Sequence, residues 1–450
     1  MNFNDLNKIY FIGVGGIGMS ALARYFLLHG MEVHGYDRTE TPLTRALADE
    51  GMQVHYTDDV SYIPEGVDLV IYTPAVPKDH SELTWFLDRG YPVKKRAEVL
   101  GIISKAKRCI ALAGTHGKTT TSTMTAWLMR SCGIDASAFL GGISGNFGSN
   151  FVEGKSQWVV VEADEYDRSF LQLYPEIAVI NSIDADHLDI YGSEEGVRES
   201  YRSFSTQVKK GGVLLLENHV DMEVPGALRF GTDKGNFRAV NVRAEDGFMV
   251  FDLQTDYPGL PTELTALKLP YPGLHNVRNA VAAIASTLLA GGNPWAIADA
   301  LREFKGAKRR FEVIARTEKT VYVDDYAHHP AELEATIAAA RLMYPGKKIT
   351  GVFQPHLFSR TRDFADAFAA ALDKLDNCLL LPIYPARELP IEGVSSDMLL
   401  KKMTLNNKQL VQKSELLQLI GNSHPEVLVT MGAGDIDTMV EPIKDLITAN

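Results

Sequence analysis

Apolar residues in the first hundred positions gather in short runs, with more polar stretches between them. The runs lie at 9–12, 32–36 and 69–72, and apolar residues with helical spacing fill the intervals. This alternation is typical of a parallel β-sheet whose strands are joined by crossover helices. We therefore predict a Rossmann-like α/β domain at residues 1–105.

The same alternation resumes twice, each time after a short basic stretch. The stretch "KAKRC" at 105–109 precedes the expected strands "CIALAG", "WVVVEAD", "IAVINS" and "GGVLLL", and 226–270 has the pattern of short β segments and turns before a helix at 276–289. The stretch "FKGAKRRFEV" precedes the strands "TVYVDDY", "KITGVFQ", "CLLLPIY" and "EVLVTMGAGD". We predict three α/β domains in series at 1–105, 106–307 and 308–450, the central one with a parallel sheet and the last again Rossmann-like.

The composition narrows the class of protein. The 450 residues are 45% hydrophobic and 23% charged, as in soluble globular proteins, and their net charge is −12. Since nucleic-acid backbones are bound by clustered Lys and Arg, this charge argues against a nucleic-acid partner. No apolar run has the length of a membrane span, the N-terminus lacks a signal-peptide pattern, and the three cysteines are scattered. We expect a cytoplasmic protein with no membrane partner, no disulfide framework and no zinc site.

A glycine loop follows the first expected strand, in "IYFIGVGGIGMSALARYF" at 9–26. Gly13, Gly15 and Gly18 fit the pattern G-x-G-x-x-G, and Asp37 ends the second strand. In such a loop, backbone N–H groups and a helix N-terminus face a pyrophosphate, and the acidic residue reaches a ribose hydroxyl. A dinucleotide and another pyrophosphate ligand fit equally well, and a glycine turn needed only for tight strand-to-helix packing stays an alternative.

A second loop follows the strand "CIALAG". Gly114, Gly117, Lys118 and Thr119 predict a phosphate loop, in which the lysine counters phosphate charge and the hydroxyl binds Mg²⁺. The loop departs from the usual spacing, because the first glycine of that pattern would fall on Leu112. The hydroxyl run 119–123 consists of poor helix formers, so a phosphate and metal ligand explains it better than an N-capping cluster does.

Two further strands end in side chains suited to a metal. The segment "VEADEYDRSF" carries Glu162, Asp164, Glu165 and Asp167, and "DADHLDIYG" carries Asp184, Asp186, His187 and Asp189. Open α/β sheets place ligands at the carboxyl ends of their strands, and carboxylates hold Mg²⁺ beside a triphosphate. His187 is a less typical ligand for a hard cation, so a capping or solvated histidine stays open.

Together these motifs resemble those of the Mur ligases, the ATP-dependent amide-forming enzymes of peptidoglycan precursor synthesis. The resemblance covers essentially the whole chain, through "GVGGIGMSA", "AGTHGKTTT", "VEADEYDRSF", "DADHLDIYG", "GLHNVRNA", "DDYAHHP", "FQPHLFSRT", "YPARELPI" and "MGAGDI". It implies that the first glycine loop binds the pyrophosphate of a UDP-sugar and that ATP, with Mg²⁺ or Mn²⁺, binds the second loop.

The resemblance also implies roles for individual residues, and the two halves of the ATP site imply domain closure. In "GLHNVRNA" a plain helix-capping role is the alternative to nucleotide binding. The implied UDP-sugar site is Gly15, Gly16, Ile17, Gly18, Asp37 and Thr73. The implied ATP site is Gly114, Thr115, His116, Gly117, Lys118, Thr119, Thr120, His275, Asn276, Asn279, Arg310 and Asp325. The implied catalytic residues are Lys118, Glu162 and His187, the metal ligands are Thr119, Glu162 and His187, and the amino-acid site is His328, His356 and Arg360.

Within the family, the resemblance implies the branch that joins L-alanine to the carboxylate of UDP-N-acetylmuramate through an acyl phosphate, as a monomer or homodimer. Several relatives use a carbamylated lysine after the D-H-x-D histidine, yet "ESYRSFSTQ" offers no lysine before Lys209. Lys209 and Lys210 look misplaced for that role. This agrees with the alanine-adding branch and leaves the ligands of a second metal incomplete.

Three other functions compete with this interpretation. A recycling ligase that adds a preformed tripeptide to UDP-N-acetylmuramate shares most motifs, but His356 and Arg360 form a compact carboxylate-binding pair that suits one small amino acid. A nicotinamide-dependent oxidoreductase would use the first loop and leave the second unexplained. A nucleotide-binding regulatory protein would bind ATP without releasing phosphate.

Overall fold

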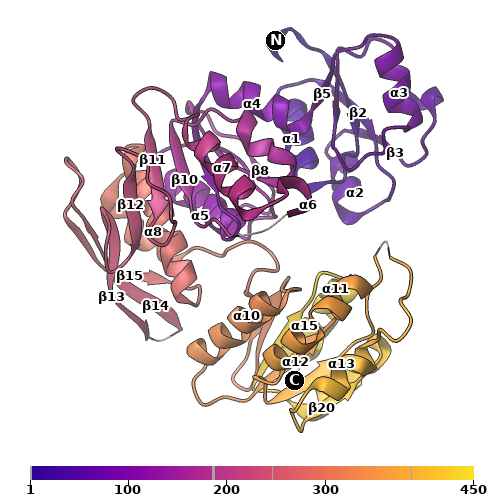
Figure 1. The fold of residues 1–450 in the computed structure, drawn as a ribbon, viewed down its shortest axis with the longest axis vertical. Helices are drawn as coiled ribbons and strands as arrows, with labels where there is room; N and C mark the ends of the chain where they lie inside the picture. Colours follow the sequence, from indigo (N-terminus) through magenta and orange to yellow (C-terminus); the bar gives the residue numbers. More distant parts are fainter. Residues whose placement is uncertain (1–2, 185–187, 246, 387, 450) are drawn as a thin grey trace. The chain divides into compact units, whose positions relative to one another are not determined.

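The computed structural model describes residues 3–184, 188–245, 247–386 and 388–449. It contains three sheets that follow one another along the chain, each with helices in its connections (Figure 1). The predicted fold class, three α/β domains in series, is confirmed. The chain divides into two compact units, the second of which consists mainly of Lys305–Asn450. Each unit is described by itself.

The first sheet has five parallel strands in the order β3-β2-β1-β4-β5. Four of the five residues of β1 are buried, as expected for a central strand covered by helices on both faces. Its strands are β1 (Lys8–Ile12), β2 (Glu32–Tyr36), β3 (Gln53–His55), β4 (Leu69–Tyr72) and β5 (Val93–Lys95). Its helices are α1 (Ile17–Leu28), α2 (Pro42–Asp49), α3 (Ser81–Asp88) and α4 (Arg96–Ala106).

The second sheet has ten strands in the order β15-β14-β13-β12-β11-β10-β6-β9-β7-β8. Its strands are β6 (Arg108–Ala113), β7 (Ser137–Phe139), β8 (Phe151–Val152), β9 (Trp158–Glu162), β10 (Ile177–Ile180), β11 (Val213–Glu217), β12 (Leu228–Thr232), β13 (Phe237–Glu245), β14 (Phe248–Thr255) and β15 (Glu263–Leu269). Its helices are α5 (Lys118–Ser131), α6 (Leu188–Tyr191), α7 (Glu194–Ser205), α8 (Leu274–Leu289) and α9 (Ile297–Arg302). The predicted β-rich stretch at 226–270 is confirmed as β12 to β15.

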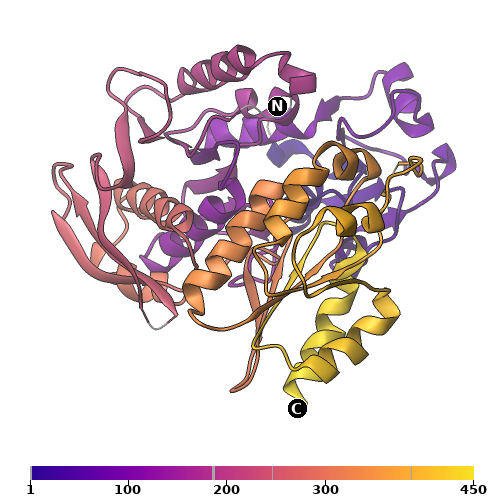
Figure 2. The same cartoon turned by 60° about the horizontal axis from the view of Figure 1, so that its bottom comes forward.

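The third sheet has six strands in the order β16-β17-β21-β18-β19-β20, and only β16 runs antiparallel to its neighbour. Helices cover both of its faces (Figure 2). Its strands are β16 (Glu312–Arg316), β17 (Val321–Asp325), β18 (Ile349–Phe353), β19 (Asn377–Leu380), β20 (Lys408–Leu410) and β21 (Val427–Met431). Its helices are α10 (Pro330–Met343), α11 (Phe358–Asp363), α12 (Ala365–Leu372), α13 (Ser396–Lys402), α14 (Leu416–Ser423) and α15 (Val440–Thr448). Among the described residues, no helix is both long and apolar enough to cross a membrane.

The first two sheets share one hydrophobic core. Aromatic rings from α1 pack against rings of the second sheet, with Tyr25 5.6 Å from Phe139 and 5.9 Å from Phe151. A buried polar contact adds to this packing, because Asn150 donates a hydrogen bond of 2.6 Å to the carbonyl of Ile17. Helix α4 and strand β6 follow each other across the basic stretch 105–109, and the domain boundaries after 105 and 307 stay predictions.

A cluster of titratable side chains is buried under the first sheet. The Tyr10 hydroxyl donates a 2.8 Å hydrogen bond to Glu82, whose side chain is fully buried, and the same hydroxyl contacts His55 at 2.7 Å. Burial raises the pKa of Glu82 to about 7, while burial lowers the pKa of His55. At neutral pH the carboxyl of Glu82 is therefore partly protonated.

This cluster makes the stability of the chain depend on pH. The folded pKa of Glu82 lies above its ordinary value of 4.5, so the folded state binds more protons than the unfolded chain between those two values. The stabilising contribution is present at low pH and is lost as the pH rises through about 7. We expect Glu82→Gln, which stays neutral, to gain on the order of 1 to 3 kcal/mol relative to the wild type between pH 5 and pH 8. Melting temperatures of both proteins at each pH test this, with exposed Glu65→Gln as control; a difference that does not change with pH would contradict it.

Candidate active site

The phosphate loop lies between β6 and α5, and two glycines give it a conformation that other residues rarely adopt. Gly114 has φ +134° and Gly117 has φ +80°. A methyl group on Gly114 would lie 2.9 Å from the backbone N of Ser182, and one on Gly117 would lie 2.6 Å from Oδ1 of Asn279. The loop is thus packed tightly between the end of β10 and the first turns of α8, where only glycine fits.

Neighbouring residues brace the rest of this loop against the segment after β10. The backbone N–H of His116 donates to the Ser182 hydroxyl at 2.9 Å, and the Thr115 hydroxyl accepts from the N–H of Asp184 at 2.9 Å. The His116 ring lies 3.3 Å from the Asp184 carboxylate. The predicted loop residues Thr115 and His116 are therefore held by backbone and side-chain contacts at the carboxyl end of β10.

Lys118 is bound by a carboxylate that the sequence pattern assigned to metals. Its ammonium donates to Glu165 at 2.8 Å and to the carbonyl of Gly114 at 2.9 Å. The side chain of Glu165 is only 4% exposed, so this is a largely desolvated ion pair. Sequence reasoning missed this partner, because the two residues lie 47 positions apart.

Glu162 and Thr119 place oxygen atoms side by side at the end of β9. The Thr119 hydroxyl donates to Glu162 at 3.1 Å, and the N–H of Gly141 donates to the other carboxylate oxygen at 2.9 Å. Burial raises the pKa of Glu162, and the nearby Lys118 opposes that rise. A buried carboxylate beside a hydroxyl supplies the hard oxygen donors that Mg²⁺ or Mn²⁺ prefers.

The structure describes only part of the predicted metal site. His187 lies outside the described residues, so its place in the site stays a prediction. Over the ranges that the structure describes, no group of three or more His, Cys, Asp or Glu side chains is arranged to hold a metal. Thr120 is half-buried in the first turn of α5, while Thr121 faces the core and accepts a hydrogen bond of 2.8 Å from Asn181. The hydroxyl run therefore serves packing as well as the loop.

Lys209 has a structural role. Its ammonium donates to the carbonyls of Ser104 at 2.9 Å and Lys107 at 2.6 Å, at the end of α4. A lysine bound in this way is held away from the phosphate loop's carboxylates, as the sequence led us to expect.

The start of α8 places two of its predicted nucleotide-binding residues beside the phosphate loop. Asn276 and Asn279 are buried, and the amide of Asn279 donates to Oδ1 of Asn276 at 3.2 Å. The other amide atom of Asn279 faces Gly117. His275 is exposed in the first turn. The helix begins at Leu274, two residues before its predicted start.

The first glycine loop leads into α1, which begins at Ile17 with Gly16 as its N-cap. Asp37 accepts a hydrogen bond of 2.7 Å from the N–H of Gly15, and Thr73 packs against Gly13, whose φ is +85°. A methyl group on Gly16 would lie at least 3.7 Å from its neighbours. The predicted residues Gly15, Gly16, Ile17, Gly18, Asp37 and Thr73 thus lie around the N-terminus of α1.

In the second unit, the two arginines at the end of the basic stretch have different surroundings. Arg309 is bound by Asp324 at 2.9 Å. Arg310 lies 5.7 Å from the Tyr326 ring and forms no ion pair with a described residue. Asp325 is buried and accepts hydrogen bonds of 2.7 Å from the N–H groups of Phe311 and Ala327, and burial raises its pKa to about 6. Asp325 thus binds the backbone directly after Arg310 and the backbone of the turn after β17.

The three predicted amino-acid-binding residues come together at the carboxyl ends of β17 and β18. The rings of His328 and His356 are 6.2 Å apart, and Nη1 of Arg360 lies 3.5 Å from Nδ1 of His356. Burial lowers the pKa of His328, and Glu332, 3.2 Å away, opposes that shift. A guanidinium beside two imidazoles is suited to binding a carboxylate.

The helix that carries Arg360 begins after His356. Helix α11 starts at Phe358, and Leu357 before it has φ +70°, a strained value for a bulky residue. His356 is therefore outside the helix and reaches Arg360 through the turn at Leu357. His356 and Arg360 would share a helix face only if a helix began at His356, and it does not; the turn brings the two side chains together instead.

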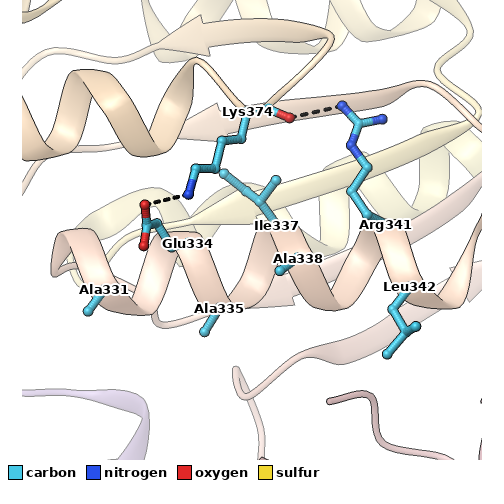
Figure 3. A pocket seen from close by; sticks show the side chains of 8 residues that line it. All are labelled: Ala331, Glu334, Ala335, Ile337, Ala338, Arg341, Leu342 and Lys374. Atoms are coloured by element: carbon cyan, nitrogen blue, oxygen red, sulfur yellow. Dashed lines mark hydrogen bonds and ion pairs between the residues drawn. The ribbon is translucent and has the colours of Figure 1, made fainter. Parts of the chain in front are cut away.

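A hollow of about 790 Å³ lies along α10, and its lining does not include His328, His356 or Arg360 (Figure 3). It is lined by small apolar side chains of α10, and its charged groups are already paired: Glu334 with Lys374 at 2.5 Å, and Arg341 with the carbonyl of Lys374 at 2.9 Å. We assign no chemistry to this hollow.

The chain belongs to the Mur ligase family. Three family models match in succession: the Mur ligase family catalytic domain at 8–108, the Mur ligase middle domain at 112–287, and the Mur ligase glutamate ligase domain at 309–434. Each family model covers all or nearly all of the strands of one of the three sheets.

Individual relatives narrow the comparison within the family. The chain is 50% identical to a UDP-N-acetylmuramate-L-alanine ligase of Flavobacterium psychrophilum, over 99% of both chains. It is 29% identical to a solved UDP-N-acetylmuramate-alanine ligase of Thermotoga maritima, with a TM-score of 0.84 over 98% of this chain and 99% of that one. A solved murein peptide ligase of Psychrobacter arcticus is 22% identical, with a TM-score of 0.71 over 98% of each chain, and shares the fold.

Proposed function

We propose that the protein is an ATP-dependent ligase that joins L-alanine to the carboxylate of UDP-N-acetylmuramate in peptidoglycan precursor synthesis. The observation that carries the proposal is the 50% identity over 99% of both chains with a UDP-N-acetylmuramate-L-alanine ligase. The alternative, a ligase that adds a tripeptide, is less well supported, because the murein peptide ligase of known structure has a TM-score of 0.71 against 0.84 for the alanine-adding enzyme.

The chemistry follows from the weakness of a carboxylate as an electrophile. A carboxylate oxygen of the substrate attacks the γ-phosphorus of ATP, ADP leaves, and an acyl phosphate forms. The alanine amine then attacks the acyl carbon, and inorganic phosphate leaves as the amide forms. In this proposal Lys118 stabilises the charge on the transferring phosphoryl group, and we assign the N-terminus of α5, which begins at Lys118, to the same phosphates. These contacts offset the repulsion between two anions.

We assign the oxygen atoms of Thr119 and Glu162 to Mg²⁺ or Mn²⁺, with His187 as the proposed third ligand. When bound there, the metal neutralises phosphate charge and orients the phosphoryl group. The 3.1 Å contact between the Thr119 hydroxyl and Glu162 supports this assignment, since both oxygens face one place.

Glu162→Gln should therefore raise the Mg²⁺ concentration needed for half-maximal activity by about tenfold or more, because a neutral amide holds a divalent cation less well than a carboxylate. Activity measured across a Mg²⁺ series tests this. Glu223→Gln, which changes an exposed carboxylate, is the control. An unchanged metal requirement in Glu162→Gln would remove Glu162 from the metal site.

Gly16→Val should weaken binding of UDP-N-acetylmuramate and spare ATP. Gly16 has φ −67° and ψ 141°, which valine adopts without strain, and the protein leaves room for the first side-chain carbon. The branched side chain would instead block close approach of a pyrophosphate to the backbone. Calorimetric titration with each nucleotide measures both affinities, and an equal loss of the two would indicate a folding defect.

The remaining residues complete the proposed substrate contacts. We assign Asn276 and Asn279, with exposed His275, to the nucleotide of ATP, together with Arg310 and Asp325 of the second unit. His328, His356 and Arg360 are assigned to the carboxylate of L-alanine. The protein acts in the cytoplasm as a monomer or homodimer in this proposal.

Release of inorganic phosphate, measured with ATP, UDP-N-acetylmuramate and one amino acid or peptide at a time, tests the proposed function. We expect release with L-alanine and much less with the tripeptide L-alanyl-γ-D-glutamyl-meso-diaminopimelate. Release only with the tripeptide would favour the recycling ligase, and ATP binding without release under any condition would favour a regulatory protein.

A further inference from the structure

Arg96 is the first residue of α4, and its side chain lies against the first glycine loop. A methyl group on Gly18 would stand 2.7 Å from Nη1 of Arg96 and 3.1 Å from its Cδ. Glycine at position 18 therefore leaves the space that the Arg96 side chain occupies beside the second residue of α1. This contact could not be predicted from the sequence, because the two residues lie on different helices.

The charge of Arg96 is unusual for its location. It stands at the N-terminus of its own helix and beside the N-terminus of α1, and both ends carry partial positive charge. No side chain caps α1 at Gly16. A cation beside two helix N-termini is electrostatically unfavourable unless an anion binds nearby. The Arg96 guanidinium and the N-termini of α1 and α4 together therefore form a position suited to an anion.

The only carboxylate paired with Arg96 among the described residues is Asp164, and the pair is loose. The closest approach is 3.6 Å, longer than a hydrogen bond, and Arg96 forms no hydrogen bond with any residue in the described part of the chain. Its side chain is 20% exposed. A guanidinium has five N–H donors in a planar fork that matches phosphate oxygens, and here those donors are uncommitted.

Asp164 lies on a segment whose neighbouring residues contact the phosphate loop. It follows Glu162, which contacts Thr119, and precedes Glu165, which binds Lys118. One turn later, Asp167 pairs with Lys95 at 2.9 Å and has φ +51°, a strained backbone value. The segment 162–167 thus touches both the first glycine loop, through Arg96, and the ATP loop, through Lys118.

We propose that Arg96 is a further substrate-binding residue, which exchanges Asp164 for the pyrophosphate of the sugar nucleotide. This inference rests on the proposed function, because that function supplies the pyrophosphate. Arg96 then contributes to affinity for the sugar nucleotide, and the released Asp164 makes the segment 162–167 responsive to whether that substrate is bound.

Calorimetric titration of Arg96→Gln and Arg96→Lys with UDP-N-acetylmuramate, UDP and ATP tests the proposal. Charge-assisted contacts of this kind predict that Arg96→Gln loses about tenfold to a hundredfold in affinity for both uridine nucleotides, that Arg96→Lys loses less, and that ATP affinity stays within about threefold. The control is Lys95→Gln, which removes the neighbouring ion pair to the same segment and should leave all three affinities unchanged. Melting temperatures monitor folding.

A second variant separates binding from a structural role. Asp164→Asn frees Arg96 from its competitor, so affinity for UDP should rise in the wild-type background and stay unchanged in the Arg96→Gln background. Equal effects in both backgrounds, or normal UDP affinity in a folded Arg96→Gln protein, would overturn the role of Arg96. Failure of the wild type itself to bind UDP-N-acetylmuramate would instead overturn the proposed function.

Discussion

Lys118→Ala is expected to lower turnover by about a hundredfold or more while leaving affinity for UDP-N-acetylmuramate nearly unchanged. In the proposed mechanism the ammonium stabilises charge on the phosphoryl group in transfer, and loss of one such contact commonly costs about 10²-fold or more. In the proposed function the sugar nucleotide binds at the first glycine loop, whereas the contacts of Lys118 with described residues are to Gly114, Thr115 and Glu165. Steady-state phosphate release and calorimetric titration measure the two quantities separately.

The variant also leaves Glu165 buried without its cation, so its folding has to be checked independently. Lys118→Gln keeps a donor for Glu165 while removing the charge, and we expect it to be equally inactive. Lys210→Ala, at an exposed lysine, is the control with normal turnover. Residual activity above about one part in a hundred in folded Lys118→Ala would count against the phosphate-transfer role.

Arg360→Lys is expected to raise the KM for L-alanine by about tenfold or more, with much smaller changes in the KM of ATP and UDP-N-acetylmuramate. A guanidinium binds a carboxylate with two parallel hydrogen bonds, whereas an ammonium provides only a point charge. The 3.5 Å contact with His356 shows that Arg360 is already directed into the cluster with His328. His328→Ala should show the same pattern more weakly.

The acyl phosphate should still form in Arg360→Lys, because the alanine carboxylate takes no part in phosphorylation. Trapping with hydroxylamine detects it. Arg362→Lys is the matched control, since Arg362 is exposed and paired with Asp363 at 2.7 Å. Normal saturation by alanine in Arg360→Lys would place the amino-acid site elsewhere in the chain.

The order of strands and helices could be predicted well from the sequence. Buried parallel strands such as β1, β6 and β21 are short continuous apolar runs, and the loops that follow them carry glycine at positions where φ is positive. The residues of each loop are adjacent in sequence, so a motif identifies them together. The same holds for the hydroxyl of Thr119 next to Lys118.

The partners of these residues could not be predicted in the same way. Asp37 reaches Gly15 across 22 residues, and Lys118 reaches Glu165 across 47, through sheet pairing that sets which strand ends are neighbours. The four acidic residues in "VEADEYDRSF" cannot be distinguished from one another by their sequence context. In the structure, Glu162 contacts Thr119, Glu165 binds Lys118, and Asp164 faces Arg96. Which carboxylate takes which role depends on the turn after β9, and composition does not encode that turn.

The late start of α11 has the same kind of cause. Leu357 takes a left-handed backbone conformation that its side chain disfavours, so no local signal announces the turn. The sequence analysis pairs His356 with Arg360, and in the structure the turn at Leu357, rather than a shared helix face, brings them together.

The most direct test of the proposed reaction follows the carboxylate oxygen. UDP-N-acetylmuramate labelled with ¹⁸O in its carboxylate is incubated with the enzyme, ATP and L-alanine, and the released phosphate is analysed by mass spectrometry. An acyl-phosphate intermediate transfers one labelled oxygen to each phosphate released, while the amide product keeps the other. Release of unlabelled phosphate alongside the amide product would contradict the account.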